Sequence, residues 1–214
     1  MRTRRTKTEQ VERRGFILDT ARSLFARRGV ENVSMDEIAR AAHYTRRTLY
    51  AYFKSADEIR LLILTEDLRR RWEVQKPRVA AADAGLAKLI AWAEALYDFT
   101  KENLHATRLQ AYWDYRGINR KHVSRESFNS FVTINDELAE GLRAIFRLGI
   151  KDHSLRPDLD VDMCISQLLH SLRSVLYRAL SPNYSFAVFE PDDYVQHFLE
   201  LFTRAVRNTK GQLV

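Results

Sequence analysis

Two adjacent arginines, Arg46 and Arg47, stand with Thr48 just after a short turn in the sequence. Residues at the start of a short helix reach base edges when that helix enters the major groove of DNA. A guanidinium can donate two hydrogen bonds to guanine O6 and N7, which contributes roughly 1–3 kcal/mol of discrimination. We therefore expect Arg46, Arg47 and Thr48 to contact bases. The alternative is that both arginines contact phosphates without reading bases.

Ser34 and Thr45 stand where two short helices are expected to begin. Free backbone N–H groups and the helix dipole make a helix N-terminus suitable for a phosphate. Ser34 with Glu37 three residues later predicts a capping box, and Ser55 with Glu58 predicts another. Ser34 and Thr45 are therefore predicted to contact the DNA backbone.

The segment from residue 34 to residue 58 must position these side chains, and its pattern predicts a helix-turn-helix. An amphipathic helix over about 9–28 precedes it and ends at Gly29, which suits a position just after a helix. His43 and Tyr44 form the predicted turn, and Leu49 and Phe53 are expected to face inward. Residues 1–8 are expected to be a flexible basic arm that either follows the DNA or is disordered.

The rest of the chain predicts further helices and no strands. Only 7 Gly and 4 Pro occur in 214 residues, so few residues interrupt helices. We expect an all-α fold of about nine helices. A helix from Ser55 to about Lys76 is followed by a connection over 77–85, and later helices are predicted at about 86–103, 105–117, 127–148, 161–180 and 192–207. Pro157, Pro182 and Pro191 are expected between them.

The net charge of +7 is concentrated at one end of the chain. Residues 1–54 hold 13 of the 35 basic and 6 of the 28 acidic residues, so residues 55–214 hold 22 of each. A basic surface releases counterions from DNA and supplies affinity that is independent of sequence. The lone cysteine, Cys164, fits a reducing compartment, and no apolar run approaches the length that spans a membrane. A cytoplasmic location is expected.

The first 60 or so residues resemble the DNA-binding domain of the TetR family of transcriptional repressors. The resemblance is carried by Ala21, Phe25 and Gly29, by Ile38-Ala39 with Ala42, and by the run Thr45-Arg46-Arg47-Thr48-Leu49-Tyr50-Ala51-Tyr52-Phe53-Lys54. It implies that Tyr50, Tyr52 and Lys54 contact phosphates, and that residues 1–54 form a DNA-binding domain followed by an effector-binding and dimerisation domain over 55–214. Two residues depart from the family pattern: His43 replaces the usual turn glycine, and Ala56 replaces a frequent basic residue.

The resemblance also implies a dimer and a ligand pocket in the second domain. The dimer interface would be built by two C-terminal helices and would include Leu168, Leu172, Val175, Leu176, Phe198 and Phe202. The pocket would lie among aromatic and polar residues, and our candidates are Trp92, His105, Arg108, Tyr112, Trp113, Phe128, Phe131, Gln167, His170 and Arg173. For any one polar candidate, an ordinary core or surface position is the more common role.

The sequence thus predicts a homodimeric DNA-binding regulator, a repressor released from a palindromic operator by a small organic molecule. One alternative is an effector-independent DNA-binding protein that acts in nucleoid organisation or through a protein partner. Another is a helical enzyme or scaffold that binds something acidic. No phosphate loop, nucleophile elbow or zinc-type spacing occurs, so we expect no catalytic residues, no metal and no cofactor.

Overall fold

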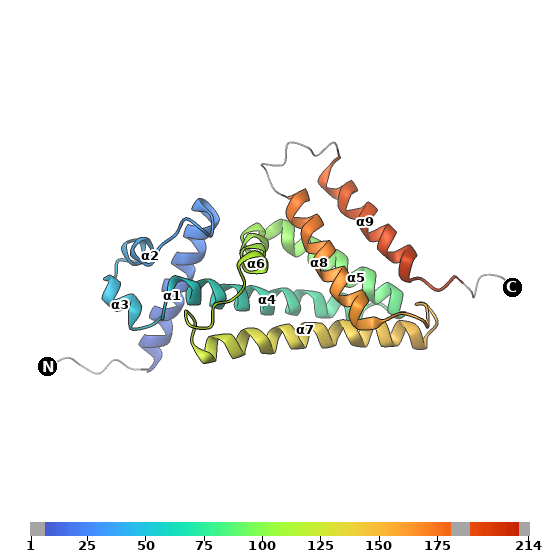
Figure 1. The fold of residues 1–214 in the computed structure, drawn as a ribbon, viewed down its shortest axis with the longest axis horizontal. Helices are drawn as coiled ribbons and strands as arrows, with labels where there is room; N and C mark the ends of the chain where they lie inside the picture. The colour runs from blue at the N-terminus through green and yellow to red at the C-terminus, as the bar shows by residue number, and fades with distance from the viewer. Residues whose placement is uncertain (1–6, 181–188, 210–214) are drawn as a thin grey trace. The chain divides into compact units, whose positions relative to one another are not determined.

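The computed structural model describes residues 7–180 and 189–209, and these residues form nine α-helices (Figure 1). They are α1 (Lys7–Arg28), α2 (Met35–Ala41), α3 (Arg46–Tyr50), α4 (Ala56–Ala80), α5 (Gly85–Glu102), α6 (Leu104–Arg116), α7 (Arg125–Lys151), α8 (Val161–Ala179) and α9 (Pro191–Val206). The predicted all-α class is confirmed. Residues 1–6 of the predicted arm, and Pro182, lie outside the described residues.

One predicted boundary is wrong. The sequence placed a connection from Pro77, but α4 continues through Pro77 to Ala80. Proline removes one backbone donor from a helix, and here that loss falls in an exposed last turn, where water can satisfy the freed carbonyl. The Lys88 ammonium donates to the carbonyls of Val79 and Ala82 (2.9 and 2.5 Å), which satisfies carbonyl groups at and just beyond the end of the helix.

The chain divides into two compact units. The first comprises residues 1–67 and 108–132, and the second comprises residues 68–107 and 133–214. Helices α4, α6 and α7 contribute residues to both. The functional division predicted after Lys54 stays a prediction.

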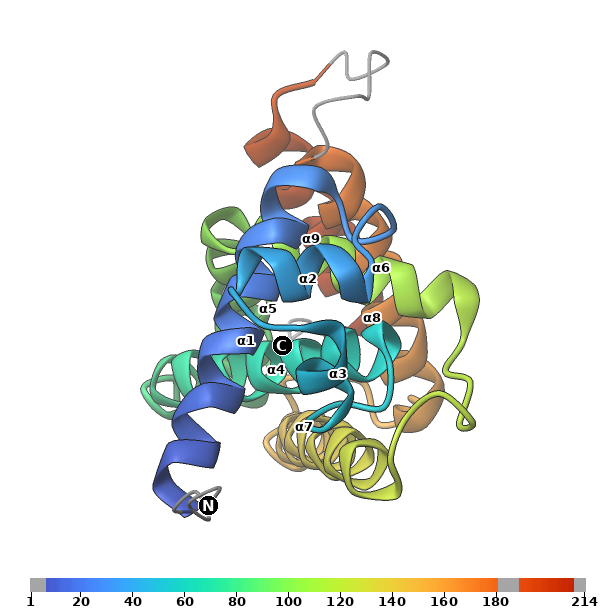
Figure 2. The ribbon, with the colours of Figure 1, turned by 90° about the vertical axis from the view of Figure 1, so that its left-hand side faces the viewer.

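The core of the first unit is formed where α1, α2 and α3 meet the start of α4 (Figure 2). Phe25 on α1 and Phe53 after α3 are the large aromatic side chains of this core, and each is 1% exposed. Its other fully buried members include Ile17, Ala21, Ile38, Leu49 and Ile59. The inward direction predicted for Leu49 and Phe53 is therefore confirmed.

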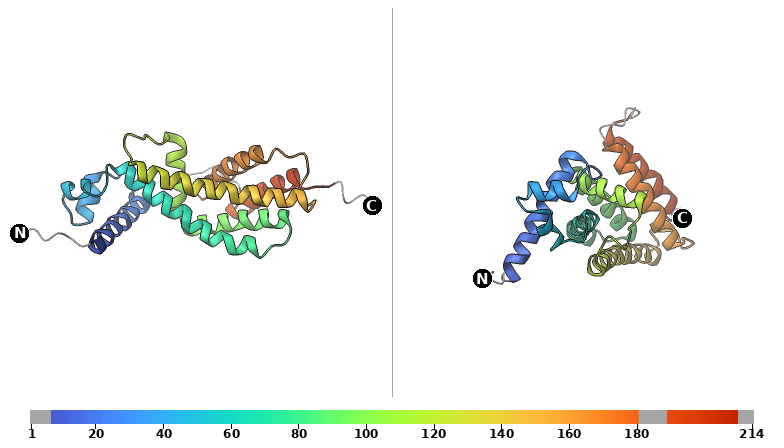
Figure 3. Two further views of the ribbon diagram at one scale, coloured as in Figure 1. Left: turned by 90° about the horizontal axis from the view of Figure 1, so that it is seen from below. Right: turned by 60° about the vertical axis from the view of Figure 1, so that its left-hand side comes forward.

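The core of the second unit is built from α5, α7, α8 and α9, of which α8 and α9 lie side by side (Figure 3). Trp92, Phe146 and Leu172 are among its fully buried members. Gly85 and Gly149 let α5 and α7 approach closely, because a Cβ on Gly85 would lie 2.2 Å from Gly149 Cα. Any larger residue at Gly85 would force this contact apart.

Across residues 7–180 and 189–209, no helix combines the length and apolar character needed to cross a membrane. The same residues hold no group of three or more His, Cys, Asp or Glu side chains placed to bind a metal.

Candidate nucleic-acid interface

The turn between α2 and α3 is closed by a histidine in a left-handed conformation. His43 has φ 57°, and its N–H donates to the Arg40 carbonyl at 3.2 Å. The Tyr44 N–H donates to the Ala39 carbonyl at 2.9 Å. The family pattern has glycine here because a side chain at positive φ is costly, and histidine is among the residues that tolerate it best. The turn geometry is therefore retained without the glycine.

Helix α3 is short, and capping and burial hold it in place. The Thr45 hydroxyl accepts a hydrogen bond from the Thr48 N–H at 3.1 Å, which confirms Thr45 as the N-cap. Leu49 is fully buried and Phe53 nearly so, as the spacing predicts. With these two side chains inward, Arg46 and Arg47 lie exposed at the start of α3. The backbone is thus fixed while the two arginines predicted to read bases face solvent. Thr48, the third predicted base contact, is partly buried, and its hydroxyl lies 2.9 Å from the Thr45 hydroxyl.

Arg46 and Arg47 differ in their surroundings. The Arg46 guanidinium lies 3.1 Å from the Asp36 carboxylate on α2, and it also covers the Tyr50 ring, 5.5 Å from its centroid. Arg47 is exposed and makes no such contact with the described residues. Arg46 must therefore leave Asp36, or share it, before it can reach a base, whereas Arg47 is available without rearrangement.

The five predicted phosphate contacts all lie in the first unit. Tyr50 and Lys54 are exposed, and the Lys54 ammonium is 3.4 Å from the Val123 carbonyl. Tyr52 is partly buried, and Thr45 is exposed. Ser34 is the N-cap of α2, and its predicted capping box with Glu37 is complete. Because the Ser34 hydroxyl already donates to the Glu37 carboxylate at 2.9 Å, a phosphate would have to compete with that carboxylate.

A buried arginine, which the sequence did not indicate, fixes the segment that precedes α2. Arg60 on α4 is 6% exposed, and it donates to the carbonyls of Val30 and Val33 at 3.0 and 2.7 Å. It also pairs with Asp57 at 2.9 Å. Arg60 therefore fixes the chain just before Ser34. The two carbonyls that it binds are 27 and 30 residues away, so no local spacing reveals these contacts.

A second buried charge, Glu58, joins the end of the helix-turn-helix to the start of α7. Its carboxylate accepts from the Lys54 N–H (2.5 Å), the Ser124 N–H (3.1 Å) and the Ser127 hydroxyl (2.8 Å). Burial raises the pKa of the Glu58 carboxyl, but these hydrogen bonds outweigh burial and leave the pKa below its usual 4.5.

The predicted capping box at Ser55 is half right. Its hydroxyl accepts from the Glu58 N–H at 3.1 Å, but the Glu58 carboxylate bonds the Lys54 N–H instead of the Ser55 N–H.

The ten predicted ligand residues are divided between the two units. Five lie in the first unit: Arg108, Tyr112, Trp113, Phe128 and Phe131. Tyr112 donates to Asp57 at 3.2 Å and meets Trp113 edge to face. Five lie in the second unit: Trp92, His105, Gln167, His170 and Arg173. Trp92 is buried in the core there, whereas Gln167 and His170 are exposed. A shared ligand contact for these residues stays a prediction.

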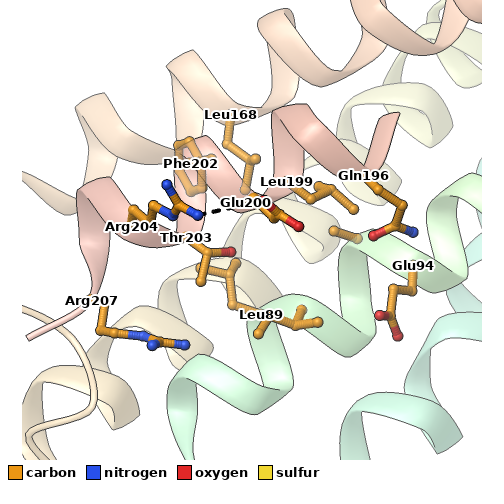
Figure 4. A pocket seen from close by; sticks show the side chains of 12 residues that line it. Leu89, Glu94, Leu168, Gln196, Leu199, Glu200, Phe202, Thr203, Arg204 and Arg207 are labelled. Carbon is orange, nitrogen blue, oxygen red and sulfur yellow. Dashed lines mark ion pairs between the residues drawn. The ribbon is translucent and has the colours of Figure 1, made fainter. Parts of the chain in front are cut away.

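The predicted dimer residues fall into two groups. Leu168, Leu172 and Leu176 are at most 1% exposed, because they pack into the chain's own core, whereas Val175, Phe198 and Phe202 are partly buried. Leu168 and Phe202 also line a cavity of about 250 Å³ that is formed by α5, α8 and α9 (Figure 4). None of the ten predicted ligand residues lines this cavity.

Comparisons with known proteins agree with this geometry. A sequence model described as "Bacterial regulatory proteins, tetR family" matches residues 17–62, which contain α2 and α3. The HTH-type transcriptional repressor KstR2 of Rhodococcus jostii is 30% identical over 151 residues, which are 71% of this chain and 72% of that protein.

Solved structures agree over most of the chain. The ketosteroid transcriptional regulator KstR2 of Mycobacterium tuberculosis superposes with a TM-score of 0.67 at 21% identity, covering 91% of this chain and 95% of that one. AibR, solved in complex with isovaleryl coenzyme A and operator DNA, gives a TM-score of 0.67 at 17% identity and covers 88% and 97%. The chain belongs to the tetR family of bacterial regulatory proteins.

Proposed function

We propose that the chain is a homodimeric repressor that binds a palindromic operator in the bacterial cytoplasm and is released by a small organic molecule. The observation that carries the DNA-binding part is the start of α3, where exposed Arg47 stands on a helix fixed by the Thr45 cap and by buried Leu49. Two such helices in a two-fold dimer would read two half-sites in successive major grooves.

Relatives support the repressor and effector parts of the proposal. The R. jostii relative is named a repressor, and AibR was solved with an acyl-coenzyme A and operator DNA. In this chain the effector would bind the second unit and favour a dimer state whose α3 helices no longer match the operator. By thermodynamic linkage, operator DNA would then weaken effector binding by the same factor.

The dimer would form through α8 and α9. Because Leu168, Leu172 and Leu176 serve the chain's own core, the contact would rest on Val175, Phe198 and Phe202 and on exposed Leu201. Two-fold pairing doubles the DNA contacts that one short helix can make.

The test is selection of binding sites from fragmented genomic DNA with the purified full-length protein. The proposal expects one enriched palindrome with half-sites about one helical turn apart. Binding that is strong but equally distributed over all fragments would refute sequence-specific regulation.

A further inference from the structure

Arg71, in the second unit, has no carboxylate partner among the described residues. Arg71 lies within α4 and is partly buried, and its Nε is inaccessible to solvent, with no hydrogen-bond acceptor among the described residues. No described carboxylate forms an ion pair with it. Buried charges are normally paired, because removing an ion from water costs several kcal/mol that only a partner can offset. Folding therefore does not supply the Arg71 guanidinium with a partner.

A second positive charge makes the position less favourable still. Burial and the charge of Arg173 on α8 together lower the Arg71 pKa to about 10. The guanidinium stays protonated near neutral pH, so two cations lie close enough to repel each other. An anion between or beside them would convert this repulsion into attraction.

Two further buried polar atoms without partners, one on α4 and one on α5, occur near Arg71. Gln75 is one helical turn after Arg71 and fully buried, and its amide N–H donates to the Trp92 carbonyl at 3.0 Å. Its Oε1 has no donor, and the Trp92 indole N–H has no acceptor among the described residues. Buried polar atoms are nearly always hydrogen-bonded, so a cluster of exceptions calls for a partner from outside the chain, which can be water, an ion or a ligand.

The side chains of the same core are apolar. Trp92 belongs to a cluster with Leu96, Leu168 and Leu172, and Trp72, next to Arg71 in the chain, packs partly buried against it. An oxyanion carried on an apolar body would match both the charge of Arg71 and these apolar neighbours.

We infer that Arg71, with Arg173 beside it, binds the oxyanion of the small organic effector, a carboxylate or a phosphate. This inference rests on the proposed function, according to which a small organic effector binds the second unit. A guanidinium suits these groups because it can donate two parallel hydrogen bonds to them. The site should discriminate against cations and neutral amides, because neither balances the charge of Arg71.

The test measures thermal unfolding and ligand affinity of the full-length protein without DNA. The probes are octanoate and phenylacetate, their neutral amides octanamide and phenylacetamide, and octyl phosphate. The variants are Arg71→Met and Arg71→Lys, with Arg69→Met as the control, because Arg69 lies exposed on the same helix. The oxyanion can be a carboxylate or a phosphate. Whichever of the two, the carboxylates or octyl phosphate, raises the Tm of the wild type more identifies it.

Three results are expected. At least one anion raises the Tm of the wild type and of the Arg69 variant, while its amide does not. Arg71→Met lowers affinity for that anion by about 10- to 100-fold, and Arg71→Lys loses less. Without ligand, Arg71→Met unfolds at a higher temperature than the wild type, because an unpaired charge is gone; a purely structural arginine would give the opposite sign.

The inference is overturned if no anion stabilises the wild type, if the amides act equally well, or if Arg71→Met keeps the wild-type affinity. Operator binding is measured separately on the same variants, and Arg71→Met should retain it. If the wild type binds no operator, the proposed function is wrong. The anion-binding measurements are made without DNA, so they still decide whether Arg71 binds an oxyanion.

Discussion

The Arg46 guanidinium on α3 is held 3.1 Å from the Asp36 carboxylate on α2. The Arg46 side chain is 60% exposed and the Asp36 side chain 50%. An ion pair this exposed contributes only about 0–1 kcal/mol to the free energy of unfolding. Its effect on DNA binding should be larger, because Asp36 keeps one predicted base-reading arginine turned toward α2 and would put a negative charge beside the DNA.

Replacing Asp36 by Asn should therefore strengthen DNA binding without changing folding. The variant frees Arg46 and removes a repulsive charge, so affinity for operator and for unrelated DNA should both rise several-fold at low salt. Fluorescence anisotropy at a series of salt concentrations measures this, with thermal unfolding as the control. An unchanged or lower affinity would show that Asp36 does not restrain Arg46 in solution.

Arg60 should be among the most sensitive positions of the first unit. Arg60→Met leaves the Val30 and Val33 carbonyls without their donor, so the free energy of unfolding should fall by about 2–4 kcal/mol. Chemical denaturation measures the loss. Arg40→Met, which alters an exposed arginine on α2, should change stability by less than about 0.5 kcal/mol. Equal losses in the two variants would argue against the anchoring role.

Glu58 gives a prediction about pH. Its pKa in the folded protein lies below the ordinary 4.5, so its ionised form stabilises the fold above about pH 4.5. That contribution is lost as the pH falls through the lower, folded-state pKa. Glu58→Gln should therefore be less stable than wild type at pH 7, by about 1–3 kcal/mol, and the difference should shrink below about pH 4.5. The exposed Glu12→Gln is the control, and a difference that does not vary with pH would contradict the account.

His43 tests the backbone of the turn. A non-glycine residue in the left-handed region costs roughly 1–2 kcal/mol of folding stability. Replacement by glycine removes this cost, but part of the gain is offset because glycine has greater conformational freedom in the unfolded chain. His43→Gly should raise stability by about 0.5–1 kcal/mol, whereas the β-branched His43→Val should lower it. Denaturation of the three proteins side by side measures the order. A glycine variant less stable than wild type would mean that the His43 side chain itself stabilises the turn.

Local features of the interface could be predicted from the sequence because their causes are local. The Ser34 and Thr45 caps depend on residues three positions apart, and the inward direction of Leu49 follows from helical spacing. The contacts of Arg60 with Val30 and Val33, and those of Glu58 with the start of α7, could not be predicted, since these partners come from distant segments that only the fold brings near.

The second unit shows the same limit. Its apolar stripes predicted α8 and α9, yet spacing alone could not tell whether Leu172 would face the chain's own core or a second copy, and it faces the core. Pro77 predicted the end of a helix, but Lys88, eleven residues later, bonds the carbonyls where the helix ends. Arg71 is an ordinary helix residue in the sequence, and only burial reveals its missing partner.

We expect α3 to read operator sequence through Arg47. The most direct measurement titrates wild type, Arg47→Ala and Lys54→Ala against the selected palindrome and against the same palindrome with its half-site bases exchanged. Wild type should prefer the intact palindrome, Arg47→Ala should lose about 1–3 kcal/mol of that preference, and Lys54→Ala should weaken both DNAs about equally and reduce the salt slope by about one. Full discrimination by Arg47→Ala would contradict the account.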